Sequence, residues 1–414
     1  MTALILENAR IFDGSNEECA EGMSVLINGE SIEEISDKPI TSQSARRMDL
    51  AGRTLMPGLI DLHIHAYASS VNLQRVATSG HTYNAAHAAR MLGHALDCGF
   101  TTVRDIGGGD WSLATSIEDG LIRGPRFFYA GRIVSMTGGH GDFRPMHVSR
   151  HDEGICQCGE SNVFSVLADG VDECLKATRE ELRQGAHCIK IMGSGGVASP
   201  ADPIWMNQYR EDEIRAIVGE CIERRTYVSS HCHGAEAIRR SVDYGVRVIE
   251  HGTLMDAETA AHVAKKGAYV VPTMAVIFAL MEEGERLGLP AVSMEKLRSV
   301  FSSALSGMEH MRDAGVKLGF GTDLLGETYI RQTQEFTIRR EVFEPVEILR
   351  QATSGSAEIL MREGELGCIA DGAAADLIVV DGDPLKDIGL LAASGEKLDL
   401  IIRRGEIVKD RLSN

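Results

Sequence analysis

Eight short apolar segments, spaced along residues 59 to 320, constrain the fold of this chain more than any other feature. Segments of this kind are typical of buried parallel strands, and the amphipathic stretches between them predict helices. The predicted strands are Leu59–His63, Thr101–Asp105, Arg126–Ala130, Cys188–Met192, Tyr227–His231, Val246–Glu250, Ala268–Val271 and Lys317–Phe320. Eight strand-helix units over roughly 250 residues or more predict an α/β fold of the (β/α)8 TIM barrel type.

Amphipathic segments between these strands predict the helices that cover the barrel. Several of them are followed by a glycine, which commonly ends a helix. The clearest segments are Val171–Gln184, Asp212–Arg224, Ala235–Tyr244, Asp256–Lys266 and Met294–Ala314. Two connections, residues 132–165 and 193–210, are longer than a barrel requires. Long loops that follow barrel strands usually cover a site or select its substrate.

The two ends of the chain have a different pattern. Residues 1–57 and 363–414 contain short strand-like segments separated by turn residues, with no long helical period. Two β-rich ends around a strand-helix middle predict a small β-sandwich built from both termini. We therefore expect a sandwich domain of residues 1–57 and 363–414 beside a barrel of residues 58–362.

Candidate metal ligands gather where the predicted strands end. Side chains alternate along a strand, so His63 and His65 point to the same side. For that pair alone, two hydrogen-bonded structural histidines are an equal alternative to a metal site. Lys190, His231, His251 and Asp323 also lie in, at or just after strand ends. Imidazole and carboxylate groups suit zinc or a similar divalent ion, so the gathering favours a metal centre.

Lys190 raises a separate question, because it lies in the apolar segment Cys188–Met192. A protonated lysine has no lone pair to offer a metal, and burying its charge is costly. Reaction with carbon dioxide would turn its amine into a carbamate that can bridge two metal ions. A lysine paired with a buried acid is the alternative, and the spacing alone does not decide between them.

The order His63, His65, Lys190, His231, His251 and Asp323, at the ends of strands one, four, five, six and eight, resembles the amidohydrolase superfamily with a binuclear metal centre. The resemblance extends from the entry segment Met56–His65 to the C-terminal segment Gly367–Asp381. It implies that His63, His65 and Asp323 bind one ion, which we expect to be Zn²⁺. His231 and His251 would bind the second, and a carboxylated Lys190 would bridge them.

Four motifs narrow the resemblance to one branch of the superfamily: Thr137–Asp142, Ile189–Pro200, Ile249–Gly252 and Gly319–Gly326. They resemble the Xaa-Pro dipeptidases, zinc carboxypeptidases and ochratoxin-hydrolysing enzymes. That branch cleaves an amide bond next to a C-terminal amino-acid carboxylate, and its members form homo-oligomers. One position departs from the pattern, because His233 stands where the branch often has a tyrosine.

The resemblance also implies a mechanism. A hydroxide that bridges the two metal ions would attack the scissile carbonyl, and Asp323 would carry its proton to the departing nitrogen. His140, in the glycine-rich turn after strand three, is the candidate to hydrogen-bond the carbonyl oxygen. His233, Tyr209 and Arg210 are candidates for binding the substrate's carboxylate or side chain.

Three other functions remain in competition with this one. A cyclic amide, imide or lactone could be hydrolysed at the same site. A single-metal deaminase is disfavoured, because deaminases of this barrel generally lack the bridging lysine. A non-catalytic scaffold is disfavoured because all the expected ligands are present.

Composition excludes several partners. A formal net charge of −18 argues against nucleic acid and anionic lipid, which need basic patches. No apolar run is long enough to span a membrane, and the first residues lack a basic leader, so we expect a cytoplasmic enzyme acting on a small molecule. The nine cysteines predict free thiols. Cys156 and Cys158 form a close pair that we interpret as loop thiols.

Overall fold

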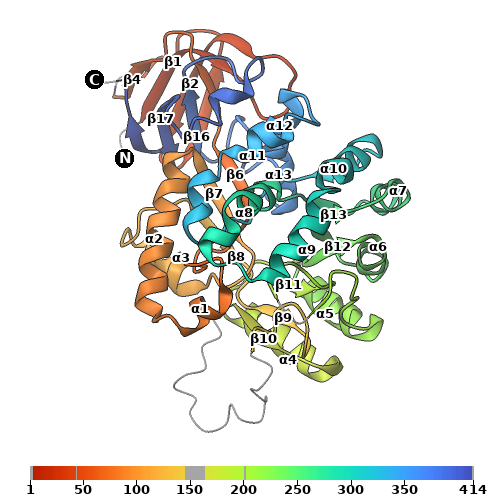
Figure 1. Cartoon of the computed structure of the whole chain (residues 1–414). Coiled ribbons are helices and arrows are strands. Elements are labelled where there is room, and N and C mark those ends of the chain that lie inside the picture. The colour runs from red at the N-terminus through yellow and green to blue at the C-terminus, as the bar shows by residue number, and fades with distance from the viewer. Residues whose placement is uncertain (1–2, 43, 145–163, 200–201, 413–414) are drawn as a thin grey trace.

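The structure is a computed structural model that describes residues 3–42, 44–144, 164–199 and 202–412. Strands from both ends of the chain lie side by side in one region, and the strands and helices of the middle of the chain form the rest (Figure 1). Cys156 and Cys158 lie outside the described residues. Among the described residues, no helix combines the length and the apolar character needed to cross a membrane.

The terminal sheet joins the first and last parts of the chain. Its strands are β1 (Leu4–Ile11), β2 (Ala20–Asn28), β3 (Ser31–Ser36), β4 (Arg46–Asp49), β5 (Thr54–Pro57), β16 (Leu377–Val380), β17 (Leu398–Arg403) and β18 (Glu406–Asp410). They follow the order β18-β17-β16-β5-β1-β2-β3, and β4 pairs with the first half of β1. The antiparallel pairing of β16 with β5 is the link between the two chain ends. This sheet has its own apolar cluster, which includes Leu6, Val25 and Leu400.

Parallel strands form the centre of the molecule. Their bounds are β6 (Leu59–Ile64), β7 (Phe100–Asp105), β8 (Arg126–Tyr129), β9 (Ile133–Ser135), β10 (Ser165–Leu167), β11 (Ile189–Met192), β12 (Val228–Gly234), β13 (Val248–Leu254), β14 (Tyr269–Val271) and β15 (Lys317–Leu318). They form a three-stranded sheet, β6-β7-β8, and a seven-stranded sheet, β10-β9-β11-β12-β13-β14-β15. All eight predicted strands overlap one of these strands, whereas β9 and β10 were not expected.

Backbone hydrogen bonds connect the two parallel sheets at both seams. Leu62 N donates to Phe320 O at 2.8 Å, beside β15, and His187 N donates to Tyr129 O at 2.8 Å, between β8 and β11. Buried backbone groups need such partners, and these bonds supply them where one parallel sheet meets the other. The arrangement is a TIM-barrel-like α/β fold.

The helices pack outside the parallel strands (Figure 1). They are α1 (Leu73–Thr78), α2 (His81–Asp97), α3 (Trp111–Glu118), α4 (Gly170–Arg183), α5 (Glu211–Glu223), α6 (Ala235–Asp243), α7 (Ala257–Lys266), α8 (Met274–Leu287), α9 (Ala291–Phe301), α10 (Ala304–Asp313), α11 (Gln334–Arg339), α12 (Pro345–Gln351) and α13 (Ser354–Ile359). Four of the five predicted helices match α4 to α7 within one residue at each end. The fifth prediction, Met294–Ala314, is wrong as a single helix.

That segment is divided into α9 and α10 at Ser302 and Ser303. Serine side chains compete with the backbone for hydrogen bonds and so favour helix ends over helix interiors. Helix α9 also begins three residues earlier than predicted, at Ala291 directly after Pro290. Proline suits this position because its missing N–H would have no helical partner.

Candidate functional site

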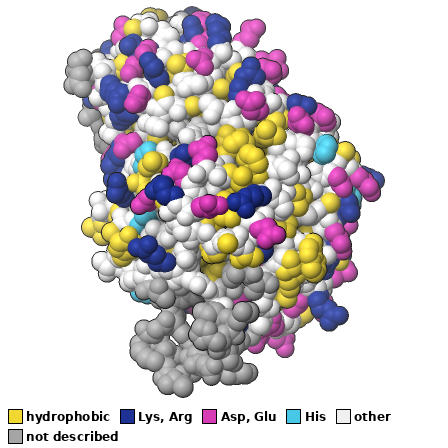
Figure 2. Space-filling model, in the orientation of Figure 1, with side chains coloured by type: hydrophobic (Ala, Val, Ile, Leu, Met, Phe, Trp, Pro, Cys, Tyr) yellow, Lys and Arg dark blue, Asp and Glu magenta, His cyan; other side chains and the backbone are white. Residues whose placement is uncertain are grey.

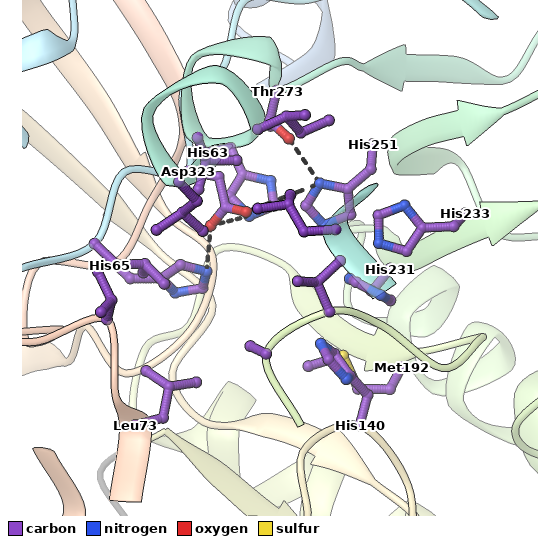
Figure 3. A pocket seen from close by; sticks show the side chains of 18 of the residues that line it. His63, His65, Leu73, His140, Met192, His231, His233, His251, Thr273 and Asp323 are labelled. Carbon is purple, nitrogen blue, oxygen red and sulfur yellow. Dashed lines mark hydrogen bonds and ion pairs between the residues drawn. The ribbon is translucent and has the colours of Figure 1, made fainter. Parts of the chain in front are cut away.

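Six histidines and one aspartate meet where the parallel strands end. His63, His65, His140, His231, His233, His251 and Asp323 line one pocket, and their side chains point toward its centre (Figure 3). Asp323 Oδ1 lies 3.4 Å from His63 Nε2 and 3.3 Å from His65 Nε2. Because β12 continues to Gly234, past its predicted end, His231 and His233 share one side of the strand.

The backbone is unusual at two of these residues. His251 has φ of 71° and Asp323 has φ of 57°. Residues other than glycine have a strained backbone in this left-handed region. Such strain persists where the surrounding structure holds it, often at functional sites. Both residues line the pocket.

Each imidazole is oriented by a partner outside the cluster. His63 Nδ1 donates to Glu250 Oε2 at 2.7 Å, and His65 Nδ1 donates to Gly107 O at 2.9 Å. His251 Nδ1 lies 2.7 Å from Thr273 Oγ1. Partners of this kind fix the ring and its tautomer in metal sites.

Glu250 is held in turn by a buried cation. Arg104 Nη2 donates to Glu250 Oε1 at 2.5 Å, and its other nitrogens donate to Leu62 O and to the Tyr227 hydroxyl. Arg104 and Glu250 are both 0% exposed. Burial opposes ionisation of Glu250, but the charges of Arg104 and His63 lower its pKa below the ordinary value. The carboxylate is therefore ionised and can only accept hydrogen bonds.

The titratable groups are poised to bind cations. Burial holds the pKa of His231 and of His251 well below the ordinary value, so both imidazoles are neutral and can offer a lone pair. Burial alone would raise the pKa of Asp323, but the charges and hydrogen bonds of His63 and His65 hold it well below its usual range. Burial alone would lower the pKa of His65. The hydrogen bond to Asp323 and the charge of that carboxylate outweigh the effect of burial, so the pKa of His65 is raised.

Lys190 lies at the floor of the same pocket and is 1% exposed. Its ammonium makes no hydrogen bond or ion pair with any residue that the structure describes, and Glu250 is already engaged by Arg104. Burial lowers the pKa of Lys190, against the opposing charges of Glu250 and Asp323. A neutral amine in this place has the lone pair that carbamate formation requires.

The donor set fits a divalent metal. Three possible ligand atoms, one each from His63, His251 and Asp323, lie within 4.8 Å of one another. Within the described part of the chain, the buried Nε2 of His231 has no hydrogen-bond partner, which is costly unless something else occupies its lone pair. Imidazole nitrogens and a carboxylate at such spacing are the ligands of zinc and related ions.

His140 lies beside this cluster, and its ring stacks on that of His231 with centroids 4.4 Å apart. Its Nδ1 donates to Asp202 Oδ2 at 2.9 Å, and Gly196 N donates to the same oxygen at 2.9 Å. A Cβ atom at Gly196 would lie 2.4 Å from His140 Nε2 and 2.6 Å from His231 Nε2. Only glycine lets the loop backbone approach the two rings so closely.

Helix α9 holds this loop through Lys296. The ammonium donates to Gly196 O at 3.1 Å, to Ser199 O at 2.7 Å and to Asp202 O. An ammonium has three donors, and three carbonyl oxygens therefore satisfy it. Lys296 thus fixes the segment that carries Asp202, the partner of His140.

The other predicted substrate residues have different surroundings. His233 lines the pocket, and burial lowers its pKa to about 3, so it is a neutral imidazole with Nδ1 3.0 Å from Thr253 Oγ1. Tyr209 is buried outside the pocket lining and donates its hydroxyl to Ala168 O at 3.1 Å. Arg210 is exposed at the start of α5. The positions of Tyr209 and Arg210 give no support to their prediction as substrate-binding residues.

Apolar side chains form the walls of the pocket, which has a volume of about 910 Å³ out to its open mouth. Helices α8 and α9 contribute one wall. Other apolar lining residues come from the segment after β6, from α1, from β9 and from positions 143 and 164. The apolar lining residues outside α8 and α9 include Val71, Leu73, Ile133, Phe143, Phe164, Met192, Val197 and Leu325.

Sequence reasoning missed the residues that support the ligands. Glu250 is the last residue of one predicted strand and Thr273 lies two residues after the end of the next, and that position was a usable signal for both. Asp202 and Lys296 carried no local signal, because each meets its partner across a large separation in sequence.

Comparison with known proteins identifies the family. A model of the Amidohydrolase family matches residues 54–408. An ochratoxinase from Aspergillus niger is 32% identical over 362 residues, which cover 84% of this chain and 73% of the relative. A crystal structure of an amidohydrolase superposes with a TM-score of 0.96 at 46% identity and covers 99% of both chains. A crystal structure of a prolidase in complex with N-methylphosphonate-L-proline gives 0.95 at 44% identity, covering 99% of this chain and 100% of the other. The chain therefore belongs to the amidohydrolase family and is a hydrolase.

Proposed function

We propose that this protein hydrolyses an amide or peptide bond next to a C-terminal amino-acid carboxylate, as in an Xaa-Pro dipeptide or an N-acyl amino acid. One observation carries the proposal: neutral imidazoles, an ionised Asp323 and a buried Lys190 that has no partner among the described residues converge in one pocket. The prolidase and ochratoxinase relatives support this class of substrate.

Two divalent ions, which we propose to be zinc, fit the donors present. His63, His65 and Asp323 would hold one ion, and His231 and His251 the other, with Lys190 between them as a carbamate. Bound there, the ions would polarise the scissile carbonyl and make a water molecule more acidic.

Asp323 would act as the proton carrier. Its pKa lies well below the usual range, so it is ionised at neutral pH and can accept a proton from the attacking water. An amide nitrogen is a poor leaving group until it is protonated, and Asp323 would return the proton to it.

His140 would stabilise the carbonyl oxygen as negative charge develops there. Asp202 can only accept, so the proton of Nδ1 is committed to it and the ring orientation is fixed. When Nε2 is protonated as well, its N–H donates to the oxygen. His233, a neutral imidazole in the same pocket, would hydrogen-bond the substrate carboxylate.

The proposal extends to the architecture. Residues 58–362 would form a closed (β/α)8 barrel, supported by the hydrogen bonds at both seams. Residues 1–57 and 363–414 would form the separate sandwich domain, supported by their own apolar cluster.

A hydrolysis screen tests the proposed function. The purified protein, supplied with zinc and bicarbonate, is given dipeptides and N-acyl amino acids alongside their C-terminal amides. We expect cleavage of the free-carboxylate series and no turnover by Asp323→Asn. Cleavage of the amides at equal rates, or of cyclic amides or lactones alone, would overturn the proposal.

A further inference from the structure

The wall formed by α8 and α9 is apolar along its whole lining surface. Helix α8, the segment after it and α9 contribute six aliphatic side chains to the pocket. They are Val276, Ile277, Leu280, Leu289, Leu297 and Val300. Helix α8 begins directly after Thr273, the partner of His251, so this wall starts at the metal ligands and extends outward.

Charge is confined to the floor of the pocket. Among the described lining residues, the charged groups other than histidine are Lys190 and Asp323, and both lie with the histidines. A charged substrate side chain against α8 and α9 would lose its water and find no counter-charge on the described side chains of these helices that line the pocket. An apolar side chain would instead gain the free energy of burial.

The wall is also held in place. Helix α8 ends at Gly288, whose φ of 89° turns the chain toward α9. Arg331 pairs with Glu283 at 2.8 Å, and Lys296 on α9 donates to the carbonyl oxygens of Gly196, Ser199 and Asp202. A preformed wall does not have to be ordered when the substrate binds, so its full burial free energy contributes to selectivity.

We propose that the α8–α9 hairpin, residues 274–301, is a subsite for a bulky uncharged side chain next to the scissile amide, either branched aliphatic or aromatic. This inference rests on the proposed function and adds the chemical class of the substrate. Filling the subsite with a leucine or phenylalanine side chain in place of alanine raises kcat/KM by about 10- to 100-fold. A lysine or aspartate side chain at the same substrate position is rejected.

A substrate matrix tests the selectivity. Each of the two groups that flank the amide is varied in turn as Ala, Leu, Phe, Lys and Asp, with the other group held constant. At one of the two positions, we expect Leu and Phe to exceed Ala by at least tenfold and to exceed Lys and Asp by more. Rates that agree within threefold across the matrix would overturn the subsite while leaving the hydrolase proposal intact, whereas no cleavage at all would refute the proposed function itself.

Substitutions in the wall test its location. Leu280→Ala and Leu297→Ala enlarge the subsite, so we expect the ratio of Phe to Ala kcat/KM to change by about tenfold. Val292→Ala is the matched control, because Val292 lies on α9 but is 40% exposed and does not line the pocket. Thermal shifts produced by free leucine, phenylalanine and lysine give a binding readout for any variant with low activity. An unchanged ratio together with unchanged binding of these amino acids would overturn the proposal.

Discussion

Replacing Glu250 by glutamine tests whether the buried pair of Arg104 and Glu250 organises the metal centre. Glu250 accepts from Arg104 on one oxygen and from His63 on the other. A glutamine amide has one acceptor and one donor, so either of its orientations turns an NH2 group toward a donor. If that group faces His63, the ring must place its proton on Nε2, the nitrogen that faces Asp323. A protonated nitrogen cannot bind a metal.

Two magnitudes follow from this geometry. Neutralising one partner of a fully buried ion pair leaves Arg104 uncompensated, which destabilises the fold by about 3 to 5 kcal/mol. Loss of the partner that orients a metal-binding histidine lowers metal affinity by about 10- to 100-fold. The first effect is measured by urea unfolding of the metal-free protein, and the second by competition for zinc with a chromophoric chelator.

Asp376→Asn is the matched control. Asp376 is 5% exposed and accepts from Arg126 Nε at 2.9 Å and from Arg404 N. Its backbone oxygen accepts from Gly58 N, directly before β6 and at the opposite end of that strand from His63. We expect this variant to lose stability while its zinc affinity stays unchanged. If Glu250→Gln were to bind zinc as tightly as the parent protein, the reasoning about His63 would be refuted.

Three further predictions concern the loop around Asp202 and the outer helices. Asp202→Asn removes the charge-assisted hydrogen bond that His140 donates to this carboxylate. We expect kcat to fall by about 10- to 100-fold while the zinc content stays unchanged. An unchanged kcat would contradict the role of His140. Lys296→Ala should lower kcat about tenfold for every substrate alike, and added ethylammonium should restore part of the lost kcat. A change in side-chain preference without a fall in kcat would contradict the role of Lys296 in positioning Asp202. Burial lowers the pKa of His94, so the unfolded chain binds the proton first and stability is lost as pH falls below about 6.5. In His94→Gln, the slope of unfolding free energy against pH should decrease by up to about 1.4 kcal/mol per pH unit. Identical slopes for the variant and the parent protein would show that His94 does not contribute to the loss of stability.

The strand pattern and the gathering of the histidines and Asp323 in one pocket were predictable from sequence because both depend on local rules. Apolar runs specify buried parallel strands, and the fold brings the carboxyl ends of such strands to one face. Histidines at those ends had to meet, as His63 and His251 do with ring centroids 4.8 Å apart. Strands β9 and β10 were not predicted because they lie within or directly beside residues 132–165, which we interpreted as a long connection.

The sequence by itself thus determined the eight strands predicted for the barrel region, helices α4 to α7 and the histidines and aspartate that gather in one pocket. Only the tertiary structure decided how those residues are held and what surrounds them. Lys296 meets Ser199 across 97 residues, and Arg104 meets Glu250 across 146. Such pairings depend on packing between distant elements, which no local spacing encodes. The same is true of the apolar wall, because a helical period can show that a helix buries one face, but not that this face borders a substrate pocket.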